Sequence, residues 1–195
     1  MAVLEIIGPR HDPGVCICRM TCLEKSIPHR FREVAWGSKS ASRENQMGIL
    51  PALRHGKVRL FTPRGITSYL ENRFNRKPLV PKDPIRACEV EQWISFVEGR
   101  LQVLMNSGSC PGHETWQQTH TCLTALSDLI SNRMCLVGRG FSLADIWLMP
   151  AADSILQQIG QAQMLHDYPA LALWFQKHSE RKSWIALNSA EEISP

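Results

Sequence analysis

The stretches NQMGILPAL, residues 45–53, and LFTPRGITSYL, residues 60–70, decide the fold of this chain. Between them, residues 54–57 (RHGK) have the composition of a hairpin turn, with a short apolar run on each side. Thr62 suits the N-cap of a helix, and Pro63 suits its first position, where an N–H has no helical partner in any case. The sequence therefore predicts two short strands joined by a tight turn and followed directly by a helix.

Upstream of this stretch the chain alternates between strand and helix patterns. Residues 3–8 form an apolar run typical of a buried strand, and residues 14–25 have helical character. Residues 31–36 (FREVAW) alternate apolar and polar side chains, as a half-buried strand does. Residues 38–47 are polar and predict a loop with room for a short helix. Residues 1–75 are thus expected to form one small α/β domain.

Beyond residue 75 the sequence changes character. The segment NRKPLVPK, which ends at Lys82, is basic and contains two prolines, so we assign residues 76–82 to a linker. The remainder, residues 83–195, contains only helical patterns and predicts an all-helical domain. Its expected helices cover residues 83–105, residues 114–132, an apolar stretch that opens with a Ser142–Asp145 capping box, and residues 168–178.

Composition and charge describe an ordinary globular protein. The chain has 195 residues, of which 44% are hydrophobic and 21% charged, so it can bury a sizeable core. The net charge of +4 is spread along the chain, and the densest basic patch, residues 73–77, fits a solvated linker better than a nucleic-acid contact. The sequence has neither a signal-peptide pattern nor the roughly 20 consecutive apolar residues of a membrane span. Seven irregularly spaced cysteines fit reduced thiols, and we expect a cytoplasmic protein without nucleic-acid or membrane partners.

The cysteines lack the spacing of a zinc site or of a redox motif. Cys16 and Cys18 form a C-x-C pair, but no second Cys/His pair follows at zinc-ligand spacing, and C-x-x-C is absent. No metal is therefore expected. Cys18 and Cys22 share one helix face, which predicts that both pack into the core.

Together these features resemble the cytosolic glutathione S-transferase (GST) family, nearest in pattern to its phi and omega classes. Residues 45–53 resemble the family pattern N-P-x-G-x-V-P-A-L, and residues 60–70 resemble L-F-E-S-R-A-I-x-x-Y-L. Residues 140–146 resemble the family's buried capping segment, and residues 168–184 resemble its Y-P…W…R-P-S-W ending. The resemblance implies the GST fold, with a thioredoxin-like N-terminal domain that binds glutathione and an all-α C-terminal domain.

The resemblance also implies details of the glutathione site. A cis peptide bond is expected before Pro51, turning the backbone of Leu50 toward the cysteinyl unit of glutathione. Lys39 lies near the position at which the family often places a basic residue for the glycyl carboxylate. Family members are commonly dimers, so the resemblance implies a homodimer.

The sequence departs from the family pattern where the γ-glutamyl unit is held. Family members use a Glu–Ser pair at the start of the third helix, and Thr62 and Pro63 stand at these positions. Thr62 keeps a hydroxyl but carries no negative charge, and Pro63 has neither a hydroxyl nor an N–H. Arg64 and the backbone amides that follow it could compensate, because a helix N-terminus favours an anion.

A second departure concerns the residue that activates the thiol, which is serine in the phi class and cysteine in the omega class. Asp12 stands there, and a nearby carboxylate raises the pKa of a thiol, although Asp12 is also a good N-cap. The free amides of Gly14, Val15 and Cys16 at the start of the helix could stabilise a thiolate instead. His11 could donate a hydrogen bond or be incidental. Cys16 could form a mixed disulfide with glutathione, although it lies one helical turn too late for that role.

Two classes of function remain open from the sequence. The first is a glutathione-dependent enzyme that acts on a small electrophilic molecule, with an activated alkene favoured because it needs less thiol activation. It would be a transferase or a cis–trans isomerase. Natural-product biosynthesis is one role that such an enzyme could have. The substrate pocket is expected between the domains, with Phe96, Arg100 and Met105 as candidate residues and Trp93 assigned to the core. The alternative is a non-catalytic binding or assembly module with the same fold.

Overall fold

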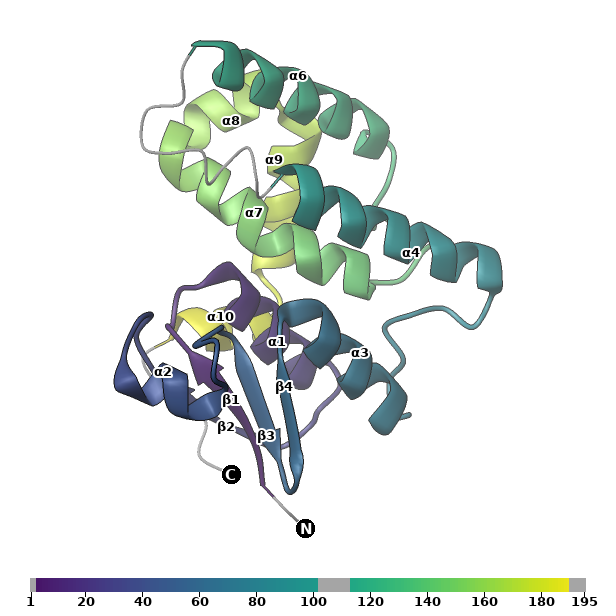
Figure 1. The fold of residues 1–195 in the computed structure, drawn as a ribbon. Coiled ribbons are helices and arrows are strands. Elements are labelled where there is room, and N and C mark those ends of the chain that lie inside the picture. Colours follow the sequence, from purple (N-terminus) through teal and green to yellow (C-terminus); the bar gives the residue numbers. More distant parts are fainter. Residues whose placement is uncertain (1–2, 102–112, 190–195) are drawn as a thin grey trace. The chain divides into compact units, whose positions relative to one another are not determined.

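The structure, a computed structural model, describes residues 3–101 and 113–189. The chain forms two compact units: residues up to Leu79 together with those from Arg181 onward, and the intervening residues Val80–Glu180. The first unit holds a sheet and helices, whereas the regular elements of the second unit are all helices in the residues that the structure describes (Figure 1). The predicted combination of an α/β part and an all-α part is confirmed.

The first unit contains a mixed four-stranded sheet in the order β2-β1-β3-β4. Strand β1 pairs in parallel with β2 and antiparallel with β3, which pairs antiparallel with β4. Gly56, at a φ of +60°, makes the predicted turn between β3 and β4. The elements of this unit are β1 (Leu4–Gly8), α1 (Pro13–Glu24), β2 (His29–Glu33), α2 (Lys39–Glu44), β3 (Ala52–His55), β4 (Val58–Phe61), α3 (Pro63–Arg73) and α10 (Lys182–Asn188).

Strand β2 begins and ends earlier than the alternation in residues 31–36 predicts. Its register along β1 runs from Leu4 opposite His29 to Gly8 opposite Glu33. Since β1 ends at Gly8, the regular pairing stops at Glu33, and the apolar residues that follow lie beyond the strand. Pairing with a neighbour, rather than the polarity pattern, sets the limits of this strand.

Alternating side chains of the sheet build two cores. Leu4 and Ile6 of β1 pack with Leu53 of β3 against buried residues of α1 and α3. Ile7 and Ala52, the neighbours of those residues along the strands, pack with Ala41 of α2. Because successive residues of a strand point to opposite faces, α1 and α3 cover one face of the sheet and α2 the other.

A buried ion pair fixes the segment that leaves the first unit. The side chain of Lys25, directly after α1, is fully buried, and its Nζ lies 2.6 Å from Oε1 of Glu71 on α3. The same ammonium donates to the carbonyl oxygen of Lys77 at 3.3 Å, and the backbone N–H of Leu79 donates to Glu71 at 3.0 Å. Part of the segment that the sequence assigns to a solvated basic linker is therefore bonded to α1 and α3.

Helix α10 belongs to the first unit, whereas the predicted domain boundaries place residues 83–195 together. Arg181 makes two hydrogen bonds of 2.8 Å to the carboxylate of Glu24, at the end of α1. Ser183 donates a further hydrogen bond to the same carboxylate. These contacts join residues far apart in the chain, so helical periodicity alone does not reveal them.

Replacing Glu24 with glutamine is expected to remove an acid-sensitive part of the stability. Burial raises the pKa of Glu24, but hydrogen bonds from Arg181 and Ser183 outweigh it and hold this pKa below its ordinary value of 4.5. A lowered folded-state pKa stabilises the fold above the ordinary value and loses that effect as the pH falls through the folded value. Urea unfolding between pH 3 and pH 7 should show this loss in the wild type and a flatter profile in the variant. At pH 7 the variant should lose about 1–2 kcal/mol, because Arg181 is partly exposed.

The second unit is a group of helices around the strongly apolar helix α7. Among the described helices, none is both long and apolar enough to cross a membrane. The predicted single helix over residues 83–105 is α-helical only to Phe96 and continues as a π-helix that contains Gly99, a weak α-helix former. The elements of this unit are α4 (Pro84–Phe96), η1 (Val97–Leu101), α6 (His113–Ile130), α7 (Leu143–Ile159), α8 (Gln161–Asp167) and α9 (Pro169–Ser179).

The predicted capping box at the start of α7 is confirmed. Oδ2 of Asp145 accepts hydrogen bonds from the backbone N–H and the hydroxyl of Ser142, both at 2.8 Å. Oδ1 accepts the backbone N–H of Leu136, also at 2.8 Å. One fully buried carboxylate therefore satisfies donors from the helix start and from the preceding loop.

Candidate functional site

Three chain segments meet at Gly14 in the first turn of α1. A Cβ atom added to Gly14 would lie 2.7 Å from Cγ of Pro63 and 3.0 Å from Cδ of Pro51. It would also lie 3.1 Å from Oδ1 of Asp12. The structure therefore brings together the start of α1, the turn before β3 and the start of α3.

The peptide bond between Leu50 and Pro51 is cis, which confirms the prediction for this turn. Leu50 and Pro51 are both buried. Gly8, at the end of β1, makes room beside the turn, because a Cβ atom there would lie 2.5 Å from Val15 and 3.7 Å from the Cα atom of Pro51. The turn thus lies against the loop that joins β1 to α1.

The start of α3 has an unusual backbone. Thr62 adopts a φ of +80°, a genuine outlier for a β-branched residue, and its Oγ1 accepts the N–H of Gly65 at 3.3 Å. Pro63 follows as the first helical residue, as predicted, and Arg64 is partly buried. Since outliers of this kind cluster at binding sites, the geometry of Thr62 supports the placement of a ligand here.

The prediction that the first amides of α1 are free is wrong. Oδ1 of Asp12 accepts the N–H of Val15 at 2.9 Å, and the backbone oxygen of Asp12 accepts the N–H of Cys16 at 2.9 Å. The N–H of Gly14 also hydrogen bonds to the Asp12 side chain. Asp12 is thus a complete N-cap: its carboxylate accepts the N–H groups of Gly14 and Val15, and the N–H of Cys16 bonds to its backbone oxygen.

The carboxylate of Asp12 is held in a partly buried, hydrogen-bonded setting. Burial raises its pKa above the ordinary value of 3.8, and hydrogen bonds from Val15, Gly14 and the side chain of Trp36 oppose that rise. Trp36 was not predicted as a site residue, and its own side chain is 53% exposed. No local sequence signal marks this contact, because it depends on how the loop after β2 folds back toward α1.

Known proteins resemble this chain in sequence and in fold. Residues 114–182 match the family model described as glutathione S-transferase, C-terminal domain. Glutathione S-transferase F14 of Arabidopsis thaliana is 23% identical over 187 residues, covering 83% of this chain and 74% of the relative. Glutathione S-transferase F9 of the same plant is 23% identical over 204 residues, covering 93% of this chain and 94% of the relative. The solved structure of poplar glutathione transferase F1 has a TM-score of 0.79 at 19% identity, covering 96% of this chain and 97% of that one.

Over most of its length the chain is similar to glutathione S-transferases. The F-numbered relatives fit the predicted likeness to the phi class, and the thioredoxin-like sheet with a helical second unit is the GST fold.

Two of the three cysteines of α1 pack into the core. Cys18 and Cys22 are fully buried in the cluster between the sheet and α3, as predicted. Burial raises the pKa of both thiols well above the ordinary value of 9.0. Cys16 is partly buried, and its Sγ lies 3.5 Å from the backbone oxygen of Arg10. Cys18 and Cys22 are therefore protonated at neutral pH and unsuited to nucleophilic chemistry.

The remaining predicted site residues are not brought to Gly14 by any contact among the described residues. His11 is exposed in the loop before α1, and Lys39 is the exposed first residue of α2. Phe96 ends α4 in the second unit, with its ring 5.8 Å from that of Trp93. Arg100, in η1, hydrogen bonds to the thiol of Cys122 on α6. Met105 lies outside the described residues.

Replacing Gly14 with alanine should damage both the site and the fold around it. The new methyl group would overlap Pro63 and Pro51, and overpacking of this kind costs about 1–3 kcal/mol. We expect a lower midpoint in urea unfolding and weaker retention on a glutathione resin. Gly99→Ala is the matched control, because a Cβ atom at Gly99 meets nothing within 4 Å. Equal stability and retention for the two variants would contradict the close approach at Gly14.

Proposed function

We propose that this chain binds glutathione on its first unit and uses the glutathione thiol as a nucleophile toward a small electrophilic organic molecule. The observation that carries the proposal is the meeting of the cis Leu50–Pro51 turn with the starts of α1 and α3 at Gly14. GST relatives that match over most of the chain support it. A rice GST and a GST homologue from Drosophila mojavensis, both with TM-scores of 0.82, are described as bound to glutathione.

Each segment of the site is assigned one part of glutathione. The backbone of Leu50, before Pro51, would hold the cysteinyl unit through main-chain hydrogen bonds. Thr62 and Arg64 would hold the γ-glutamyl carboxylate at the start of α3, a place that favours anions. Lys39 would meet the glycyl carboxylate. Since Pro63 offers no N–H, the γ-glutamyl unit is expected to be held less tightly than where a serine stands there.

The electrophile is expected to be reactive in itself, such as an activated alkene. Asp12 already occupies the amides of Val15 and Cys16, so these donors are not available to a thiolate. The carboxylate also opposes a second negative charge nearby. A site with weak thiolate stabilisation suits a conjugated alkene, because addition to such a carbon needs less thiol activation than displacement of an unactivated halide does.

Two reactions begin with this same addition. The thiolate forms a bond to the β-carbon of the conjugated alkene, and the electron pair of the double bond moves toward the activating group. If the adduct takes up a proton and leaves, the protein is a transferase. If the adduct rotates and expels the thiolate, the double bond is restored in the other geometry, and the protein is a glutathione-dependent isomerase. Either reaction could serve natural-product biosynthesis.

A second candidate is a non-catalytic module that keeps the fold and the peptide-binding turn. The N-cap by Asp12 and the proline at the start of α3 favour it, because both weaken the handling of glutathione. The retained cis bond before Pro51 favours the enzyme.

Calorimetry followed by product analysis tests the proposal. Titration with reduced glutathione should give a dissociation constant in the millimolar range or below, and the absence of heat at millimolar glutathione would refute the enzyme. Incubation with glutathione and a panel of conjugated alkenes then separates the reactions by mass. A transferase product gains the mass of glutathione, whereas an isomerase product keeps the substrate mass and changes its retention time.

Replacing Asp12 with serine should raise ordinary conjugating activity by about tenfold or more. The variant removes a charge beside the thiol and supplies a hydroxyl donor, and a hydrogen bond to a charged group contributes about 1.5–3 kcal/mol. Serine is also a good N-cap, so α1 should remain intact. Initial rates with 1-chloro-2,4-dinitrobenzene, followed by absorbance, measure the change. Asp12→Asn keeps the cap without the charge and separates the two effects, and unchanged rates in both variants would place Asp12 away from the thiol.

Three further expectations complete the proposed function. Phe96, Arg100 and Met105 are proposed to contact the electrophile, and alanine at each should change the Michaelis constant of the alkene rather than that of glutathione. The protein is proposed to be a homodimer, which light scattering tests. It is proposed to act in the cytoplasm, which a fluorescent fusion tests.

A further inference from the structure

The two units divide the charged residues of the chain unevenly, although these residues are spread along the sequence. Residues 1–79 and 181–195 hold sixteen lysines and arginines against eight aspartates and glutamates. Residues 80–180 hold six against ten. Basic residues therefore outnumber acidic ones two to one in the first unit, while the second unit is acidic. A basic surface that attracts acidic partners is expected on the first unit.

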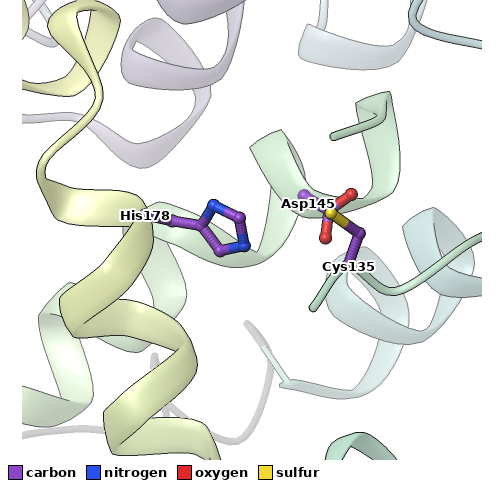
Figure 2. A group of neighbouring side chains, drawn as sticks. All are labelled: Cys135, Asp145 and His178. Carbon is purple, nitrogen blue, oxygen red and sulfur yellow. The ribbon is translucent and has the colours of Figure 1, made fainter. Parts of the chain in front are cut away.

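One group of polar side chains in the second unit is internal. Cys135, Asp145 and His178 are buried and lie together (Figure 2). Asp145 caps the start of α7, and Nε2 of His178 lies 2.8 Å from the backbone oxygen of Met134. These side chains are bonded within the unit, so the charges that can meet a partner are those on the surface.

The pairing of the strands aligns three arginines in one row across the sheet of the first unit. Glu5 of β1 lies opposite both Arg30 of β2 and Arg54 of β3. Arg54 in turn lies opposite Arg59 of β4. Directly paired residues have their side chains on the same face of a sheet. Arg30, Glu5, Arg54 and Arg59 therefore cross all four strands on one face, and we call these four residues the arginine row.

The arginine row lies on the sheet face that α2 covers only in part. Ile7, two residues after Glu5 in β1, packs with Ala41 of α2. Residues two apart in a strand point to the same face, so the row and α2 share that face. Because α2 is only six residues long, it leaves the three arginines of the row exposed.

Acidic neighbours compensate the arginines of this face only in part. Glu44, at the end of α2, pairs with Arg32 of β2 and lies 3.8 Å from Nε of Arg54. Glu5 lies 3.3 Å from Nε of Arg32. The guanidinium of Arg59 donates to neighbouring backbone oxygens at 2.7 and 2.8 Å, which carry no charge. Among the residues that the structure describes, the two arginines at the ends of the row form no ion pair, so the face keeps a surplus of positive charge.

We propose that the arginine row binds an extended acidic segment of another protein. Neighbouring strands lie about 4.8 Å apart, so the row is about 14 Å wide. Side chains on one face of an extended peptide lie about 6.7 Å apart, so three carboxylates at alternate positions span about 13 Å and match the row. Arginine can form two parallel hydrogen bonds to each carboxylate, which lysine cannot. None of the residues assigned to glutathione takes part in this contact.

The two glutamates of this face favour a peptide over a nucleic acid. Glu5 lies within the row, and Glu44 lies beside Arg54. A nucleic-acid backbone carries one negative charge at every nucleotide, so some of its phosphates would meet these carboxylates. Like charges brought together in this way weaken binding. A peptide can instead place uncharged residues opposite the glutamates while its acidic residues meet the arginines.

Fluorescence anisotropy with the full chain and a labelled peptide of alternating glutamate and serine tests the proposal. We expect a dissociation constant below about 0.1 mM at low salt. Salt at about 0.5 M should weaken binding at least tenfold, because it screens exposed charges. A peptide of alternating lysine and serine should not bind. The absence of binding by the glutamate peptide at about 1 mM would overturn the proposal.

The double variant Arg30→Gln with Arg59→Gln should weaken binding of the glutamate peptide at least tenfold. Both residues are exposed, so the melting temperature should stay within about 2 °C of the wild type. Arg73→Gln with Arg76→Gln is the matched control, because it removes the same charge from exposed residues in or just after α3, which covers the other face of the sheet. The control should change binding by less than about threefold.

Two results would overturn the assignment of the face. Equal weakening in the two double variants would mean that the peptide is attracted by net charge rather than by the arginine row. A labelled oligothymidylate of the same length that bound at least ten times more tightly than the glutamate peptide, at the same salt concentration, would assign the face to nucleic acid.

Discussion

Glu71→Gln should lower the free energy of unfolding by about 3–5 kcal/mol, among the largest effects that we expect from a single substitution here. The ammonium of Lys25, 2.6 Å from Oε1 of Glu71, is fully buried, so the variant leaves a charge in the interior without its carboxylate. The same carboxylate accepts the N–H of Leu79, so the exit of the chain from the first unit should loosen as well. Urea unfolding, followed by tryptophan fluorescence, measures the change.

Two controls separate the buried charge from other effects. Glu33→Gln removes an ion pair of 3.3 Å with Arg10, but Glu33 is 56% exposed, so this variant should lose less than about 1 kcal/mol. The double variant Lys25→Met with Glu71→Leu replaces both charges by apolar groups and should recover the part of the loss that comes from the unpaired charge, although the N–H of Leu79 still loses its acceptor. If Glu71→Gln and Glu33→Gln proved equally mild, the interior pair would not contribute to stability in the way proposed.

Asp145→Ala should be comparably severe, with a loss of about 3–5 kcal/mol. The substitution removes the acceptor of three hydrogen bonds, all of 2.8 Å, and leaves the N–H groups of Leu136 and Ser142 buried without it. It also leaves a small cavity at the start of α7. Thermal unfolding and amide hydrogen exchange of α7 should both report the change, with faster exchange in its first turn.

Asp153→Ala is the matched control for the cap, because Asp153 lies on the same helix. Its described hydrogen bond, from Gln157 at 2.8 Å, is exposed, so the variant should lose less than about 0.5 kcal/mol. Asp145→Asn adds a second test. An amide at this position turns an N–H toward a donor, so asparagine should recover little of the loss. A stable Asp145→Asn variant would indicate that the cap tolerates the loss of its charge.

Local chemistry allowed much of the fold to be predicted. The strand–turn–strand–helix order after Pro51, the N-caps at Asp12 and Thr62 and the box at Ser142 each depend on residues within a few positions of one another. The local structures that these residues favour are present in the folded protein because tertiary packing is compatible with them. The cis bond before Pro51 followed from the likeness to the GST family rather than from the residues alone.

The structural features that the sequence did not predict depend on contacts between residues that are far apart in the chain. The attachment of α10 to α1 through Glu24 and Arg181 leaves no periodic trace in the chain. The burial of Lys25 is not expected for lysine without knowledge of Glu71. For the candidate site, the sequence placed Asp12 correctly as a cap but did not predict that this cap would use all three amides.

The anchoring of the chain around α1 has a consequence for protein engineering. The segment that leaves the first unit is bonded to Lys25 at Lys77, and the segment that returns to it is bonded to Glu24 at Arg181. Two consecutive residues therefore hold both segments. The second unit is in effect an insertion between residues 79 and 181, and the first unit holds the segments at both of its ends. A short peptide of glycine and serine could therefore join residue 79 to residue 181, giving a single-unit protein in which glutathione binding can be studied without the helical part. In the reverse direction, helical units from other relatives could be transplanted between the same two anchors.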